Sequence, residues 1–154
     1  MKAVMISIQP KWVELICSGK KTLEVRKKRP SIQAQFKCYV YETKSMHGRG
    51  KVIGEFICDD ILTLGSQPSV EREMLIEEAC LTEQELRFYK GKYAWHISDL
   101  KVYDDPKDLN KFYRTQKCDS CEIGYESSAC IFDEECNVPV NMTRPPQSWC
   151  YVEE

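Results

Sequence analysis

A short apolar run that ends at a proline opens the chain and limits how it can fold. Residues 3–8 are nearly all apolar, which indicates a buried strand, and Pro10 stops it. Pro10 is also a favourable first residue of a helix, because the amide proton that it lacks needs no partner there. Apolar Trp12, Leu15 and Ile16 recur at helical spacing, and Gly19 suits the left-handed conformation that ends a helix. The chain is therefore predicted to begin with a strand, a short helix and a tight turn.

Short strands and helices are predicted to follow. The strands are expected at residues 22–27, 36–41, 51–58, 93–103 and 149–152. The helices are expected at residues 70–80, at 82–91 behind a capping box of Thr82 and Glu85, and from Asp105 and Pro106 to residue 112. A regular βαβ series would need a helix between most strands. We therefore expect an α+β fold, a mixed β-barrel decorated by helices.

Length and composition favour one folded domain. The 154 residues, 42% of them hydrophobic, suit a single core, so we expect one domain over residues 1–154. No run approaches the roughly 18 apolar residues of a membrane-spanning helix, and the N-terminus lacks a secretory pattern. We therefore expect a cytoplasmic protein without a membrane partner. In that compartment the nine cysteines are expected to be thiols or metal ligands rather than disulfides.

The charge is distributed unevenly. Residues 1–51 hold twelve basic residues against three acidic ones, a net charge of +9, whereas residues 52–154 carry a net charge of −11. Clustered charges act over about 8 Å at physiological salt, so the basic part could attract a polyanion. The alternative is a lysine-rich solvated surface. The acidic part could instead serve a protein-binding adaptor.

The most informative run is GKKTLEVR at residues 19–26. Alternation places Thr22, Glu24 and Arg26 on one exposed face of the predicted strand, with Lys21 at its start. Lys21 and Arg26 could hold a phosphate while Glu24 accepts hydrogen bonds from a base or a sugar. The alternative is a solvated strand face whose charges pair with neighbouring strands.

This run resembles the G-x-K-x-x-E-x-R signature of the ASCH family, relatives of the pseudouridine-synthase-and-archaeosine-transglycosylase (PUA) domains, with matches at Gly19, Lys21, Glu24 and Arg26. The runs YAWHISDL at 93–100 and TRPPQSWCYV at 143–152 also resemble ASCH-domain proteins of Firmicutes and their phages. The resemblance implies a PUA-like β-barrel with a cleft beside the signature strand that binds RNA or a nucleotide.

In such a cleft, each basic residue has an expected role. Lys21 and Arg26 would bind phosphate or carbonyl oxygens, Glu24 would contact a polar base edge or orient Arg26, and Lys11 would add charge at the mouth. Arg144 precedes two prolines, which stiffen the chain and could present its side chain to the ligand. The same stiffness could serve strand closure alone.

The three tryptophans and one histidine also have two possible roles. Trp12, Trp95 and Trp149 are candidate platforms for base stacking, or they belong to the core. His96 is either a hydrogen-bonded structural residue or a ligand contact at the cleft.

One ASCH branch resembles an amidohydrolase that deacetylates N4-acetylcytidine with a Thr nucleophile, a Lys and a Glu. The Lys corresponds to Lys21, but the Thr position is occupied by Glu24 in this chain. A carboxylate cannot form the same ester, although it could activate a water, and Thr22 could act only with shifted geometry. An enzyme acting on an acylated nucleoside through Lys21, Glu24 and Thr22 is therefore the alternative function.

Four cysteines near the C-terminus form a second candidate site. Cys118, Cys121, Cys130 and Cys136 lie in a segment, residues 117–141, that has little helical or strand pattern and reads as an inserted Cys-rich loop. Tetrahedral zinc needs four such ligands and stabilises loops that lack a core of their own. The alternative is a loop of free thiols.

Overall fold

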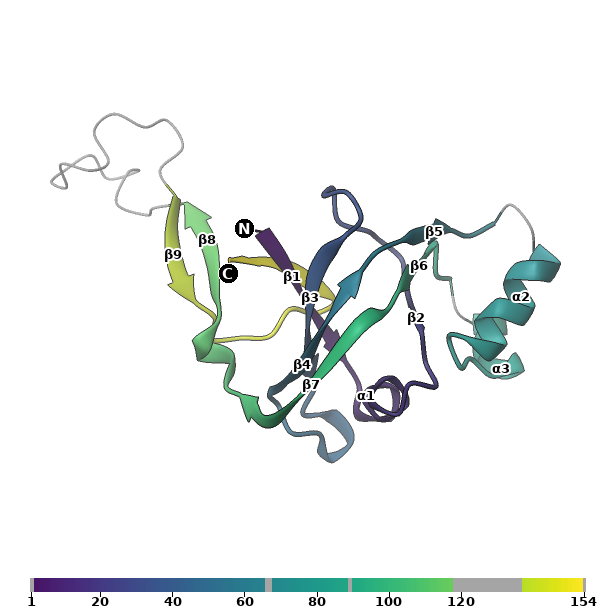
Figure 1. The fold of residues 1–154 in the computed structure, drawn as a ribbon, viewed down its shortest axis with the longest axis horizontal. Coiled ribbons are helices and arrows are strands. Elements are labelled where there is room, and N and C mark those ends of the chain that lie inside the picture. The colour runs from purple at the N-terminus through teal and green to yellow at the C-terminus, as the bar shows by residue number, and fades with distance from the viewer. Residues whose placement is uncertain (1, 66–67, 89, 118–136, 154) are drawn as a thin grey trace, which may run out of the picture.

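The computed structural model describes residues 2–65, 68–88, 90–117 and 137–153. Seven strands form the larger sheet: β1 (Lys2–Ile8), β3 (Phe36–Glu42), β4 (Val52–Cys58), β7 (Ser98–Lys107), β8 (Tyr113–Lys117), β9 (Asn137–Asn141) and β10 (Trp149–Glu153). Their order is β7-β4-β3-β1-β10-β8-β9, and only β1 and β3 run parallel among these described pairs (Figure 1). The N-terminal strand therefore lies at the centre of the sheet.

A smaller sheet carries the signature run. Its strands are β2 (Leu23–Arg26), β6 (Tyr93–His96) and β5 (Ile61–Thr63), in the order β2-β6-β5. The described helices are α1 (Pro10–Cys17), α2 (Pro68–Glu77) and α3 (Glu83–Phe88), with short 3-10 turns η1 (Ser45–His47) and η2 (Leu109–Lys111). Figure 1 shows α2 and α3 together at one end of the molecule, and β8 and β9 at the opposite end. None of the described helices has the length or the apolar character needed to cross a bilayer.

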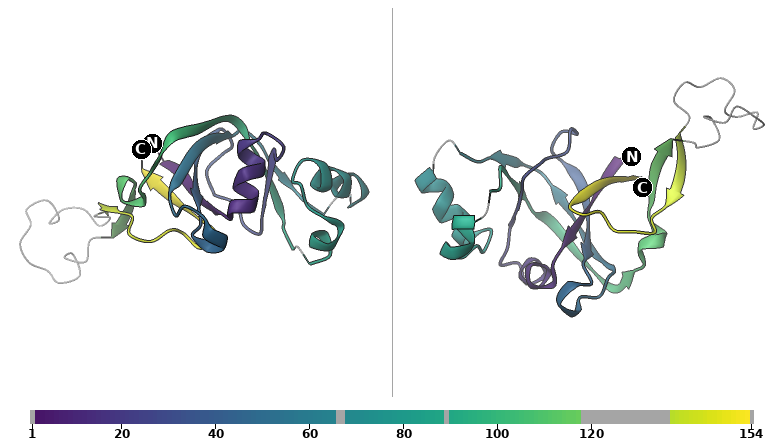
Figure 2. Two further views of the ribbon diagram at one scale, coloured as in Figure 1. Left: turned by 90° about the horizontal axis from the view of Figure 1, so that it is seen from below. Right: turned by 180° about the vertical axis from the view of Figure 1, so that it is seen from behind.

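The apolar core connects both sheets to the helices. One buried cluster joins α1 to the large sheet, and another joins the small sheet to the segments around α2 and α3. Figure 2 shows the curvature of the large sheet and α1 beside it. Trp12 packs against both clusters. The start of α1 is thus the junction between the two halves of the fold.

The turn after α1 places the signature run. Pro10 occupies the first turn of α1 as the sequence predicts, and Gly19 adopts a left-handed φ of +73°. The backbone N–H groups of Lys20 and Lys21 both donate to the Leu15 carbonyl at 3.0 Å. The chain therefore reverses tightly, and Lys21, two residues before β2, lies directly beside α1.

Five predicted strands are confirmed, at residues 3–8, 22–27, 36–41, 51–58 and 149–152. Three predicted helices are confirmed over their central turns, at residues 10–18, 70–80 and 82–91. The α+β class is confirmed as well, but the described strands form two sheets rather than one closed barrel.

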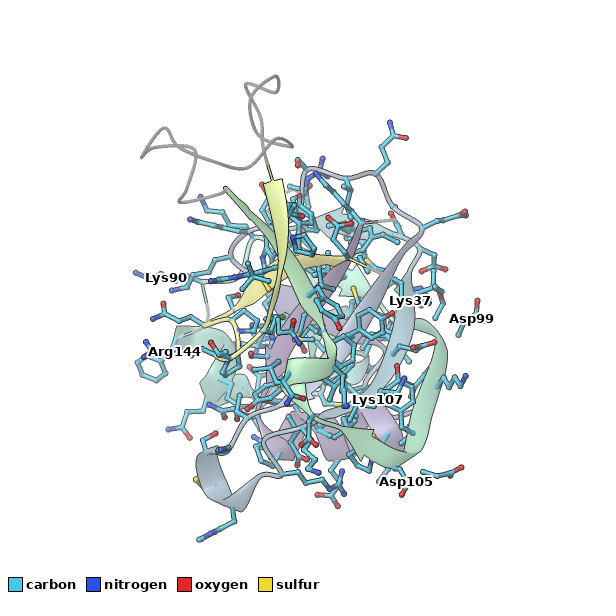
Figure 3. All side chains as sticks on the ribbon, turned by 90° about the vertical axis from the view of Figure 1, so that its left-hand side faces the viewer. Lys37, Lys90, Asp99, Asp105, Lys107 and Arg144 are labelled. Carbon is cyan, nitrogen blue, oxygen red and sulfur yellow. The ribbon has the colours of Figure 1, made fainter. Side chains whose placement is uncertain are left out.

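Two predicted elements are wrong. The strand expected at 93–103 is two strands in different sheets, β6 and β7, which are separated at Ile97. Asp99, the second residue of β7, has a φ of 46°. Of the helix expected from Asp105 to residue 112, residues 105–107 are instead the end of β7, and only Leu109–Lys111 form a helical turn, η2. Figure 3 labels Asp105 on the extended strand. Pro106 is tolerated there because β7 is an edge strand, where a missing donor costs no ladder bond.

The ends of the segment 117–141 form regular strand structure that its sequence does not predict. β8 and β9 pair antiparallel from Tyr113 with Asn141 to Lys117 with Asn137, so residues 137–141 are strand rather than loop. The four candidate zinc ligands, Cys118, Cys121, Cys130 and Cys136, lie outside the described residues. The zinc site stays a prediction.

Candidate ligand-binding site beside strand β2

Three charged side chains of the signature form a continuous row. The Lys21 Nζ lies 3.4 Å from the Glu24 Oε2, and the Arg26 Nε lies 3.0 Å from the Glu24 Oε1. Both contacts are ion pairs, and neither has the alignment of a hydrogen bond. Lys21 is 3% exposed and Glu24 is 7% exposed. The sequence correctly groups these residues, but the expectation of an exposed strand face is wrong.

Lys21 is held by the backbone as well as by Glu24. Its Nζ donates to the carbonyl of Leu23 at 2.7 Å and to the carbonyl of Ala79 at 2.9 Å. An ammonium has three N–H groups, and the third has Glu24 as its neighbour. A buried ammonium is costly unless all its donors are used, so these contacts explain how Lys21 can lie inside the fold. They also join β2 to the chain after α2.

Arg26 connects the small sheet to the large one. Its Nη2 donates to the Ser7 carbonyl at 2.7 Å, and its Nη1 donates to the Ser148 Oγ at 3.3 Å. The Ser7 hydroxyl in turn donates to the Pro146 carbonyl at 2.6 Å. Arg26 therefore links β2, β1 and the segment that leads into β10.

A small hollow opens beside this row, and we call it the Trp12 hollow. It has a volume of about 180 Å³ and is lined by Trp12, Lys21, Glu24, Val25, Leu81 and Glu85. The Lys11 Nζ lies 4.2 Å from the centre of the Trp12 ring, and the Lys21 Nζ lies 5.0 Å from it. The hollow thus combines an aromatic ring, an apolar wall and two carboxylates.

A larger and more open groove lies on the other side of the Glu24–Arg26 ion pair. This Arg26 groove has a volume of about 650 Å³ and is lined by Arg26, Lys27, Lys28, Gln147, Ser148 and Trp149. Lys27 and Lys28 are exposed. The groove is therefore basic and accessible, in contrast to the Trp12 hollow.

Other predicted site residues lie at varying distances from these surfaces. Lys11 is not part of either lining, but it pairs at 2.7 Å with Glu85, which lines the hollow. Arg144 is exposed on the connection between β9 and β10 and is also absent from both linings (Figure 3). Thr22 is absent from both linings too. The His96 Nδ1 lies 2.6 Å from the Asp59 Oδ1. His96 is therefore a hydrogen-bonded residue, as one of its two predicted roles requires.

The tryptophans divide between core and site. Trp95 is completely buried and belongs to the core, where it contacts Phe36 and Trp149 edge-on or tilted. Trp12 and Trp149 are partly buried and line the hollow and the groove respectively. Two of the three candidate stacking platforms are therefore at the surface that the signature predicts.

Sequence reasoning missed three residues of the site. Lys27 and Lys28 directly follow the signature, so a longer reading of that basic run would have found them. The sequence indicates Glu85 only as a capping residue, and it does cap α3: its Oε2 accepts from the Thr82 N–H at 2.8 Å and from the Thr82 hydroxyl at 2.9 Å. Nothing in the local sequence indicates that its other oxygen reaches Lys11.

The Lys11–Glu85 contact joins α1 to α3 and lowers the pKa of Glu85. The hydrogen bond from Lys11 is the largest cause, followed by the bond from the Thr82 N–H, and together they hold this pKa at about 2 instead of 4.5. Because the folded-state pKa is the lower one, the stabilisation is complete above pH 4.5 and is lost as the pH falls towards 2. Acid should therefore loosen the contact between α1 and α3.

Replacing Glu85 with Gln tests this pH dependence. Urea unfolding of the wild type and of Glu85→Gln should give a difference in free energy that is largest at neutral pH and shrinks as the pH falls through 4.5 to 2. A difference that stays constant over this range would contradict the assigned cause.

Removing Lys21 should destabilise the fold strongly. Lys21→Ala leaves the buried Glu24 without one cation and leaves the carbonyls of Leu23 and Ala79 without their donor, so we expect a loss of about 3–5 kcal/mol. The matched control is the exposed neighbour, Lys20→Ala, for which we expect a change within about 0.5 kcal/mol. Urea unfolding measures both, and equal losses would show that Lys21 does not hold the row together.

Comparisons with known proteins agree with this architecture. The solved structure of ASCH from Zymomonas mobilis has a TM-score of 0.65 and 21% identity, and covers 99% of this chain and 88% of its own. A single-substitution variant of that protein gives a TM-score of 0.65 and 21% identity, with coverage of 100% and 92%. No curated protein sequence matches significantly. The ASCH domain profile matches residues 6–128, and the chain therefore belongs to the ASCH domain family.

Proposed function

We propose that the protein binds a nucleotide unit, as a free nucleotide or within single-stranded RNA, at the paired surfaces beside β2. The observation that carries this proposal is the Glu24–Arg26 ion pair, which has a ring-sized hollow on one side and a basic groove on the other. A nucleotide has the matching division into a flat base and an anionic phosphate. The ASCH family resemblance, with its PUA-like fold, favours the same class of ligand.

The Trp12 hollow suits the base. Its volume of about 180 Å³ compares with the roughly 150 Å³ of a cavity that holds one benzene molecule, so it can admit a single ring system but no folded oligonucleotide. The Lys11 Nζ lies 4.2 Å from the centre of the Trp12 ring, and we expect a base to displace this exposed side chain and stack on the indole. Stacking on an aromatic side chain contributes roughly 1–3 kcal/mol per base. Val25 and Leu81 supply apolar contacts.

The Arg26 groove suits the phosphates. Lys27 and Lys28 are exposed lysines at its edge, so their ammonium groups can reach a phosphate without breaking the buried row. Lys21 has a different role in this proposal, because its three donors already face two carbonyls and Glu24. It holds Glu24 in position. Arg26 forms the boundary, since its guanidinium is bound to Ser7 and Ser148.

The salt dependence of RNA binding tests the role of the groove. For a fluorescently labelled single-stranded RNA, log K should fall linearly with log salt concentration. The double variant Lys27→Ala/Lys28→Ala should bind more weakly and should lower this slope by about 0.7 for each phosphate that the groove no longer neutralises. Fluorescence anisotropy over a range of salt concentrations measures both quantities.

The control variant is Lys101→Ala. Lys101 is an exposed lysine on β7, which is separated from β10 by three strands, so its removal changes the net charge without touching the groove. Its salt slope should match that of the wild type. Absence of binding to both RNA and free nucleotides would favour the adaptor function, and equal slopes for all variants would contradict the assigned groove.

A nucleoside amidohydrolase is the second candidate function. It is favoured by one observation, the contact between Lys21 and Glu24 at the edge of a hollow that can admit a base. In this reaction Glu24 would take a proton from a water as the water oxygen attacks the acyl carbonyl. It would return this proton to the amide nitrogen as the C–N bond breaks, which gives the nucleoside amine and a carboxylic acid. Mass spectrometry of acylated nucleosides incubated with the protein should detect deacylated product only if this function is correct. Such turnover should be lost in Glu24→Gln.

A further inference from the structure

We propose that the Trp12 hollow selects guanine, and that Glu24 determines this specificity. The proposal rests on the nucleotide binding proposed above and adds the identity of the base. It follows from the hydrogen-bonding groups that the lining leaves open to a ligand.

The lining residue Lys21 is held mainly by the fold. Its Nζ donates to the carbonyls of Leu23 and Ala79, and the Glu24 Oε2 lies 3.4 Å away as an ion-pair partner. An acceptor on a base edge would therefore compete with Glu24 for the remaining N–H of this ammonium. A ligand that needs Lys21 as a donor would weaken the ion pair that holds Glu24 in place.

The second carboxylate of the lining, Glu85, is largely occupied. Its Oε2 accepts from both the N–H and the hydroxyl of Thr82, and its Oε1 accepts from the Lys11 Nζ at 2.7 Å. These contacts tie Glu85 to the start of α3 and to α1. They leave Glu24 as the better acceptor among the described lining residues.

Glu24 has one open acceptor position on each oxygen. Its Oε1 faces the Arg26 Nε at 3.0 Å and its Oε2 faces the Lys21 Nζ at 3.4 Å, so each oxygen has one cationic neighbour. A carboxylate oxygen has two lone pairs, and the second pair on each oxygen remains available. Glu24 is 7% exposed and lines the hollow, so its position is fixed and its open acceptors are directed by the fold.

Guanine is the standard RNA base with two adjacent donors on its Watson–Crick edge. Its N1–H and its exocyclic N2 amine can donate in parallel to the two oxygens of one carboxylate, as the fork of a guanidinium does. Cytosine and adenine each place a ring-nitrogen acceptor beside their amine, and uracil flanks its N3–H with two carbonyl acceptors. Those acceptors would face the negative charge of Glu24, and only one hydrogen bond would form.

The expected discrimination is large enough to measure. A bidentate contact between a side chain and a base edge changes affinity by roughly 5- to 150-fold relative to the wrong base. Trp12 adds little to this selectivity, because every base has a face that can stack. Base choice should therefore depend on Glu24, and overall affinity should depend on Trp12 and the groove.

Isothermal titration of the wild-type protein with GMP, IMP, AMP, CMP and UMP tests the proposal without any variant. GMP should bind at least about fivefold more tightly than AMP, CMP or UMP. IMP keeps the N1–H of GMP and lacks only the N2 amine, so its affinity should lie between GMP and the other three. Equal affinities, or a preference for another base, would overturn the guanine assignment while leaving nucleotide binding intact. Binding of none of the five, together with no binding of RNA, would overturn the proposed function itself.

The Glu24→Gln variant tests the residue. Glutamine keeps the shape of the side chain but turns one acceptor into a donor that opposes the guanine edge, so the preference for GMP over AMP should disappear. The control is Glu14→Gln, an exposed carboxylate on α1 that lies outside the hollow and should keep the preference. Circular dichroism checks that each variant is folded. If Glu24→Gln does not fold, the GMP and IMP affinities of the wild type decide the question, since they differ by the one amine that Glu24 would accept.

Discussion

The buried carboxylate of Glu24 is the interaction on which the arrangement of the site depends. Taking a charge out of water is costly, and the fold compensates by placing a cation at each oxygen of Glu24. Each cation then needs partners of its own, which come from distant parts of the chain: Lys21 reaches Ala79, and Arg26 reaches Ser7 and Ser148. Satisfying one carboxylate therefore joins the small sheet to the helical end on one side and to the large sheet on the other.

The same row separates two surfaces of different character. The Trp12 hollow is small and partly apolar, whereas the Arg26 groove is larger, open and edged by exposed lysines. Residues 1–51, with their net charge of +9, contribute four residues of the hollow lining and three of the groove lining. This charge would attract a negative ligand at long range, and the exposed Lys27 and Lys28 could then exchange water for phosphate at the groove.

Local patterns in the sequence correctly predicted the elements whose ends are determined by neighbouring residues, through capping bonds and preferred backbone angles. Pro10 and Gly19 fix both ends of α1, and the capping box at Thr82 begins α3 at the expected position. The strand expected at 93–103 was wrong because Asp99 takes a left-handed φ of 46° after a change of sheet, which periodicity cannot reveal. Burial of Glu24 could not be predicted either, since an alternating polar strand looks the same whether its charges face water or one another.

Some contacts of the site join residues that are far apart in the sequence, and local sequence patterns cannot predict them. The partner of Lys11 is Glu85, 74 residues further along the chain, and the partner of Lys21 is the carbonyl of Ala79, which no side-chain pattern marks. These long-range contacts decide which hydrogen-bonding groups are used up by the fold and which remain for a ligand. A signature can name Lys21 and Glu24 as a pair, but only the surrounding contacts reveal that the lysine donates to two backbone carbonyls while the carboxylate faces two cations. In the proposed site, the carboxylate of Glu24 therefore provides the main hydrogen-bonding group for a ligand, although the most evident feature of the signature in the sequence is its basic residues.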